Sequence, residues 1–212
     1  DRWILSRLSR TAEAVRDALH GYYFNDAANA CYRFVWHEFC DWYLEAAKPA
    51  LYGKQNEEAK VAARAVLWRV LHDTLILLHP MIPFVTEEIW HHLPGTEGSI
   101  MKARFPGHTD KLPEIAVDAA AEADMDLLIG IITSVRNIRG EMNIAPSTAL
   151  SVLIQTDSAD VREKLQHYRD MIGSLARLES LAIEAAGEKP KGTATAIVAD
   201  VTVSVHLEGV ID

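Results

Sequence analysis

The stretch from Tyr22 to Pro49 constrains the fold more than any other part of the chain. Its sequence, YYFNDAANACYRFVWHEFCDWYLEAAKP, holds nine of the sixteen aromatic residues. From Ala27 onward its apolar residues recur at helical spacing, about 100° per residue. They fall on one broad face: Ala28, Cys31, Tyr32, Val35, Trp36, Phe39, Trp42, Tyr43 and Ala46. So broad an apolar face needs partners on several sides, which predicts the central helix of a bundle, ending at Pro49 because proline cannot continue a helix.

The opposite side of this predicted helix carries a polar row at successive i,i+4 steps, made of Asn29, Arg33, His37 and Asp41. Phe34 falls on the same side. A charged stripe is usually only a solvated face. An exposed aromatic ring beside Arg and Asn is also the chemistry that binds an unstacked nucleic-acid base. Both interpretations stay open, and the candidate contact residues here are Asn29, Arg33, Phe34 and His37.

Composition limits the class of protein. The chain has 212 residues, 49% of them hydrophobic and 24% charged, which is typical of a globular domain. It has no apolar run near the roughly 20 residues of a membrane helix and no secretory leader. Because it begins at Asp1, already inside a helical pattern, we expect a piece of a longer protein. The net charge of -9 means that any nucleic-acid site must be a local basic patch.

Periodicity predicts the remaining elements. Helices are expected over 1–20, from Gln55 or Asn56 to His79, over 81–93 and over 118–142, with a long connection over about 94–117. After Pro146 the apolar period changes from 3.6 to 2, which predicts strands over 149–155, 180–184, 194–199 and 201–207, and one helix over 158–175. The predicted fold class is mainly α: a helical bundle over 1–146 followed by a small α/β subdomain over 147–212.

The end of the helix predicted over 118–142 has an unusual sequence, VRNIRGEMNIAP. Arg136 and Arg139 fall close to its apolar stripe, and Asn143 follows them. One interpretation is that the arginines interact with a helix C-terminus, which favours cations. The other is that this end contacts an anionic partner, which makes Arg136, Arg139 and Asn143 candidate nucleic-acid contacts.

Candidate chemistry is sparse. The chain has no glycine-rich phosphate loop and no HExxH or CxxC pattern. His37, Cys40 and Asp41 have helical spacing that would allow a shared metal, but no second ligand cluster accompanies them. His37 and Cys40 as a nucleophile pair lack an orienting group. Cys31 and Cys40 lie on opposite helix faces about 13 Å apart and cannot pair, which fits a reducing compartment. We therefore expect no catalytic residue, metal or cofactor site in this chain.

Three segments together resemble a known family. HPMIPFVTEEIWHHL resembles the HP-x-x-PF-x-TEE-[IL]-W-x-x-L signature of the helical C-terminal domain in class I aminoacyl-tRNA synthetases for valine, isoleucine and leucine. FVWHEFCDWYLEAAKPAL resembles the aromatic helix of that domain, and VRNIRGEMNIAPS is similar to the form in the valine-specific branch. DRWILSRL and LEGVID also resemble that branch, so the resemblance spans the whole chain. SIMKARFP departs from a form with Trp before the Pro, in a connecting loop only.

The resemblance implies an anticodon-binding helical domain with a small α/β appendage, taken from a valine-specific synthetase. The HIGH and KMSKS signatures of the family's catalytic domain are absent here. ATP and Mg²⁺ would therefore belong to the parent enzyme's catalytic domain, and no cofactor to this chain. The implied partners are valine tRNA, through its anticodon loop and stem, and the catalytic and editing domains of the same polypeptide, in a monomeric, cytoplasmic enzyme without a membrane partner. A coiled-coil arm would begin just past Asp212.

Two alternatives remain at this point. An anticodon-binding domain for isoleucine or leucine would share the bundle, but should not carry VRNIRGEMNIAPS. A helical protein-interaction module would explain the bundle and the negative charge, but not arginines near an apolar face.

Overall fold

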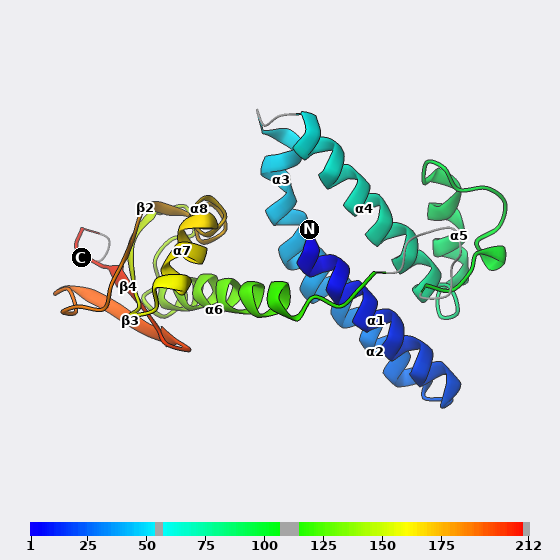
Figure 1. Cartoon of the computed structure of the whole chain (residues 1–212), viewed down its shortest axis with the longest axis horizontal. Helices are drawn as coiled ribbons and strands as arrows, with labels where there is room; N and C mark the ends of the chain where they lie inside the picture. The colour runs from blue at the N-terminus through cyan, green and yellow to red at the C-terminus, as the bar shows by residue number, and fades with distance from the viewer. Residues whose placement is uncertain (54–56, 107–114, 210–212) are drawn as a thin grey trace. The chain divides into compact units, whose positions relative to one another are not determined.

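The computed structural model describes residues 1–53, 57–106 and 115–209 and divides into two compact units, Asp1–Glu122 and Ala123–Asp212 (Figure 1). The first unit is all-helical and the second is α/β, so the chain is mainly α with a small α/β part, as predicted. The start expected for the third helix, at Gln55 or Asn56, lies outside the described residues. So do part of the long connection and the last residues of LEGVID.

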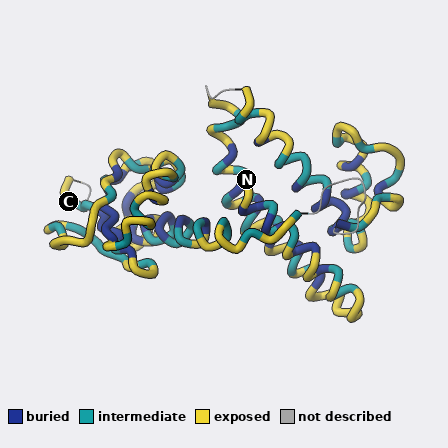
Figure 2. Tube along the Cα trace, viewed as in Figure 1, coloured by how far each residue is buried: buried dark blue, intermediate teal, exposed yellow. Residues whose placement is uncertain are grey.

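The first unit is built around helix α1 (Arg2–His20) and a long helix that runs back beside it. That second helix is continuous through α2 (Phe24–Arg33), η1 (Phe34–Tyr43) and α3 (Leu44–Tyr52). Apolar residues at helical spacing, including Ile4, Leu8 and Val15, bury one side of α1. Dark blue segments, marking buried residues, recur along these helices (Figure 2).

The central helix departs from the sequence-based prediction in the side that it buries, and its middle part, η1, is a π-helix of 10 residues. Hydrogen bonds from i to i+5 turn each residue by less than 100°, so later residues of η1 drift from a face drawn at 100°. Phe34 begins η1 and lies at ordinary helical spacing from the buried Ala27 and Cys31. Phe34, predicted on the polar side, is only 1% exposed, whereas Trp36, predicted on the apolar face, is 53% exposed. Trp42, predicted at the centre of that face, is only partly buried. The predicted orientation of Phe34 and Trp36 is therefore wrong, and the burial predicted for Trp42 is only partial.

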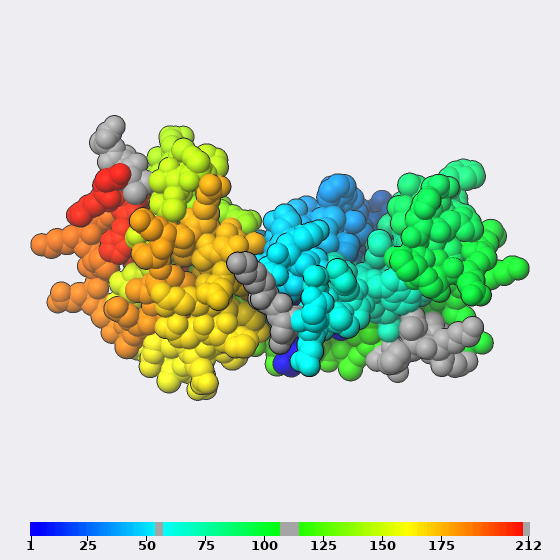
Figure 3. Space-filling model, turned by 90° about the horizontal axis from the view of Figure 1, so that it is seen from above, coloured from blue at the N-terminus to red at the C-terminus, as the bar shows by residue number. Residues whose placement is uncertain are grey.

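The end of the central helix also differs from the prediction. Pro49 lies inside α3, which continues to Tyr52 and ends at Gly53. A proline removes one backbone donor, and its ring crowds the carbonyl four residues earlier, but neighbouring packing can hold the helix together. Helix α3 packs against α4, and the cyan atoms of α3 lie beside the teal atoms of α4 in the space-filling view (Figure 3).

Two further helices and a short turn complete the first unit. They are α4 (Glu57–Leu78), α5 (Pro83–His92) and the 3₁₀ turn η2 (Ile100–Lys102). Pro83 occupies the first turn of α5, as predicted, where a missing donor costs nothing. Leu75, Ile76, Trp90 and Ile100 form a common hydrophobic cluster, which confirms that Trp90 packs inward.

The second unit is a four-stranded sheet covered by helices. It comprises α6 (Ala119–Glu141), whose first residues belong to the other unit, β1 (Leu150–Gln155), α7 (Ala159–His167), α8 (Arg169–Ala176), β2 (Leu178–Glu184), β3 (Thr193–Val198) and β4 (Val201–His206). The strand order is β2-β1-β4-β3. Strand β1 pairs parallel with β2 and antiparallel with β4, and β3–β4 is the predicted hairpin. The single helix predicted over 158–175 is two helices that meet at Tyr168.

Helix α6 belongs mostly with the sheet. The sequence-based division at 146 grouped this helix with the bundle, whereas the compact units meet between Glu122 and Ala123. Its buried residues, among them Leu128, Ile131 and Ile132, recur at helical spacing along the part that lies in the second unit. Gly130 permits a close approach to the sheet, because a Cβ added there would lie 2.7 Å from Val198 Cγ1.

Candidate nucleic-acid interface

The polar row predicted on the central helix is exposed to solvent. Asn29, Arg33, His37 and Asp41 are all exposed, on α2 and η1. The Nδ1 atom of His37 lies 3.4 Å from Oδ2 of Asp41. Within residues 1–53, 57–106 and 115–209, the side chains of Asn29 and Arg33 make no hydrogen bond or ion pair. Their donor groups are therefore available to a partner.

Two aromatic rings that the sequence placed in the core stand beside this row. Tyr32 is 55% exposed and Trp36 is 53% exposed. Their ring centroids are 6.5 Å apart, and the ring of Tyr32 also meets that of His37 edge to face at 5.8 Å. We call Tyr32, Trp36 and His37 the ring cluster. Sequence reasoning missed it because the predicted apolar face was too broad and included the side of the helix opposite the buried Ala27 and Phe34.

Phe34, the aromatic residue predicted for this surface, does not reach it. It is among the largest fully buried side chains, and its ring belongs to the core of the first unit. The buried stripe of this helix passes through Ala27, Cys31 and Phe34, the side that faces α1 and α4. In this conformation the Phe34 ring is not accessible for stacking on a base.

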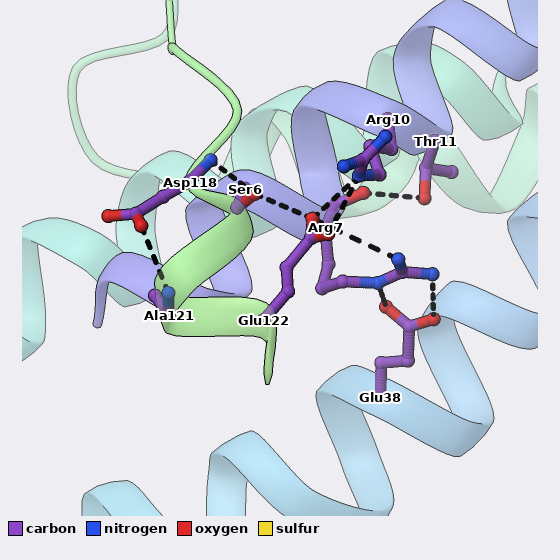
Figure 4. A network of polar contacts seen from close by, with 8 residues as sticks. All are labelled: Ser6, Arg7, Arg10, Thr11, Glu38, Asp118, Ala121 and Glu122. Carbon is purple, nitrogen blue, oxygen red and sulfur yellow. Dashed lines mark hydrogen bonds and ion pairs between the residues drawn. The ribbon is translucent and has the colours of Figure 1, made fainter. Parts of the chain in front are cut away.

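Two carboxylates of the first unit, Glu38 on η1 and Glu122 at the start of α6, pair with arginines of α1. Arg7 on α1 donates Nε and Nη2 to the two oxygens of Glu38, at 2.9 and 2.8 Å. Arg10 donates Nε to both oxygens of Glu122, and Ser6 donates its hydroxyl to the same carboxylate (Figure 4). Partial burial would raise the pKa of Glu122, but these hydrogen bonds and the charges of Arg10 and Arg7 lower it overall. The network ties the start of α6 and the middle of η1 to α1.

The arginines of VRNIRGEMNIAP are engaged within the second unit. Arg136 donates Nε and Nη2 to the carbonyl oxygen of Leu175, near the end of α8. Arg139 donates to four carbonyl oxygens, those of Ala145, Thr148, Ala176 and Arg177. Carbonyls at a helix C-terminus carry partial negative charge and favour such cations. The two arginines therefore hold α8 and the loop before β1 onto α6.

Asn143 also has a local structural role. Its φ is 53°, in the left-handed region that Asn tolerates better than most residues. The N–H of Ile144 donates to the carbonyl of Arg139 across this turn, which ends α6. The structure thus brings together Asn29, Arg33 and His37 on one helix, and places Arg136, Arg139 and Asn143 in the other unit.

Other kinds of site find little support. Among the described residues, no group of three or more His, Cys, Asp or Glu side chains is arranged to hold a metal ion. Burial, and then the charge of Asp41, raises the pKa of Cys40, which is the opposite of what activates a thiol nucleophile. None of the described helices combines the length and apolarity needed to cross a membrane.

Comparison with known proteins identifies the family. The family described as the anticodon-binding domain of tRNA ligase matches residues 1–154. Proteins named valine–tRNA ligase from Geobacter sulfurreducens, Desulfotalea psychrophila and Bacillus licheniformis are 44%, 41% and 38% identical over 100% of this chain. The chain spans 24%, 23% and 24% of their respective lengths, about a quarter of each. With its helical unit wholly inside the matched residues, the chain belongs to the anticodon-binding domain family of tRNA ligases.

Proposed function

We propose that this chain is the part of a valine–tRNA ligase that recognises the anticodon loop and stem of valine tRNA. The observation that carries the proposal is the exposed polar row, in which the donors of Asn29 and Arg33 have no partner among the described residues. The names of the relatives support valine over isoleucine or leucine, and the family match supports a tRNA partner over a protein-interaction role.

The row offers the contacts that RNA recognition requires. A guanidinium such as that of Arg33 can bind a phosphate, or stack on a base and bond to its edge. The amide of Asn29 has both donors and acceptors for a base edge. Because Arg7 neutralises Glu38 beside the row, an approaching phosphate meets less negative charge than the net charge of -9 implies.

The chemistry of the parent enzyme would lie outside this chain. We infer that the complete polypeptide activates valine with ATP and Mg²⁺ in a separate catalytic domain, as a cytoplasmic monomer, and transfers it to tRNA. This chain would supply recognition only, with no catalytic residue of its own. Its contribution would be differential binding of the correct anticodon, which raises specificity without taking part in a bond-making step.

The test uses Arg33→Ala in the full-length ligase, titrated with valine tRNA carrying native or altered anticodons. Loss of one stacking or charge-assisted contact should weaken binding by about 1–3 kcal/mol. A phosphate contact would also reduce the salt dependence of binding, whereas a base contact would make the loss depend on the anticodon. Arg139→Ala is the contrast, since it should destabilise the second unit. Equal affinity of wild type and Arg33→Ala for every tRNA, with the fold intact, would refute the assignment.

A further inference from the structure

We propose that Tyr32 and Trp36 form a platform on which an unpaired base of the tRNA anticodon loop stacks, with Arg33 and His37 contacting its polar edge or its phosphate. This inference rests on the proposed function and names the binding chemistry of that surface. It replaces Phe34, the ring expected from the sequence, with two rings that the structure exposes.

Exposure distinguishes these rings from the other aromatics of the same helix. Phe34, Phe39 and Tyr43 are buried in the core of the first unit. More than half of the surface of Tyr32 and of Trp36 remains accessible, although each is large enough to bury substantial apolar area if turned inward. The two rings are neighbours at a tilt of 54°, so they form one continuous aromatic surface.

The π-helix brings His37 into the ring cluster. Hydrogen bonding from i to i+5 places His37 against Tyr32, five residues earlier, at 5.8 Å between ring centroids. Phe34 begins η1 and continues the buried side of Ala27 and Cys31 at ordinary helical spacing, whereas Trp36, two residues later, lies on the exposed side. Long π-helical segments are rare, and π-turns occur frequently at functional sites.

The neighbouring side chains favour RNA as the occupant. A packed helix would need an apolar border, but the ring cluster is bordered by Arg33 and Asn29, whose donors have no partner in the described part of the chain. Two carboxylates of η1 are engaged: Glu38 with Arg7, and Asp41 with His37. A base combines an apolar face with a polar edge, which matches rings flanked by donors, and stacking tolerates any base.

The experiment measures binding of the valine tRNA anticodon stem-loop to the full-length ligase. Trp36→Leu and Tyr32→Leu keep apolar bulk without a stacking ring, and Trp36→Phe keeps a ring. Tyr52→Leu is the matched control, because Tyr52 is an 83% exposed aromatic on α3, outside the ring cluster. Stem-loops with 2-aminopurine at single loop positions report stacking by fluorescence quenching. The thermal midpoint of each variant is measured in parallel.

We expect Trp36→Leu to weaken binding by about 10- to 100-fold and to relieve the quenching at one loop position. Trp36→Phe should recover most of the affinity, and Tyr52→Leu should bind like wild type. If wild type prefers the native anticodon but Trp36→Leu, Tyr32→Leu and Tyr52→Leu all bind equally, the platform is refuted and the proposed function stands. If Trp36→Leu lowers the thermal midpoint without changing affinity, another part of the polypeptide covers the rings and the platform is again refuted. No anticodon preference in wild type would overturn both proposals.

Discussion

Replacing Phe34 and Trp36 separately by alanine in this chain tests directly which side of the central helix faces the core. Phe34 is 1% exposed, so Phe34→Ala leaves a cavity in the core and should lower the free energy of unfolding by about 3–5 kcal/mol. Trp36 is 53% exposed, so Trp36→Ala should cost about 1 kcal/mol or less, because only part of its burial is lost. The orientation expected from the sequence, with Trp36 on the apolar face and Phe34 on the polar side, predicts the reverse order.

The assay is urea unfolding followed by tryptophan fluorescence. All five tryptophans lie in the first unit, at positions 3, 36, 42, 68 and 90, so the signal reports that unit alone. A loss of 3–5 kcal/mol is a large fraction of the stability of a typical domain, so Phe34→Leu provides a milder core variant, with a cost below about 1.5 kcal/mol. Equal midpoints for the two alanine variants, or a larger loss for Trp36→Ala, would show that the helix phase described here is wrong.

Two further predictions concern the network around α6 and the packing of its middle. The pKa of Asp118 is lowered by the N–H of Ala121 and by Arg2, and that of Glu122 by the hydrogen bonds of Arg10 and Ser6 in spite of burial. In the folded protein the pKa of each carboxyl lies below its ordinary value, which is 3.8 for Asp118 and 4.5 for Glu122. The stabilisation from each ionised carboxylate is therefore fully present at a pH above the ordinary pKa, and it is lost as the pH falls through the lowered pKa of the folded state. The urea midpoint of the first unit should therefore fall below about pH 4.5, and Glu122→Gln should flatten that decline; an equally steep decline in the variant would contradict the role of Glu122. Gly130→Ala should destabilise the second unit by about 1–3 kcal/mol through contact with Val198, measured by hydrogen exchange of β4 amides, and Val198→Ala should relieve the effect; a stabilised Gly130→Ala would mean that helix propensity outweighs the contact.

The sequence by itself determined where most elements lie. A period of 3.6 located α1 and α6, and a period of 2 located β1 and the β3–β4 hairpin, within a few residues of their bounds. These patterns can be recognised from a short stretch of sequence, because the apolar side chains of an element lie on the side that packs, whatever that side packs against. The exposure of Asn29, Arg33 and His37 follows from the same patterns, since charged and amide side chains at i,i+4 spacing seldom lie in a core.

Only the tertiary structure decided what each side chain meets. Phe34 is buried and Trp36 is exposed because the side of the central helix that carries Ala27, Cys31 and Phe34 packs on its neighbours, a choice made between helices and not within one. Arg136 and Arg139, candidate RNA contacts from the sequence, donate to carbonyls of α8, 39 and 37 residues away in sequence, which no spacing along α6 could predict. Arg7 likewise reaches Glu38 across 31 residues. The spacing of residues along one helix indicates which of them share a side. The residues that pack against that side come from distant parts of the sequence, and the free energy of burial or ion pairing depends on them.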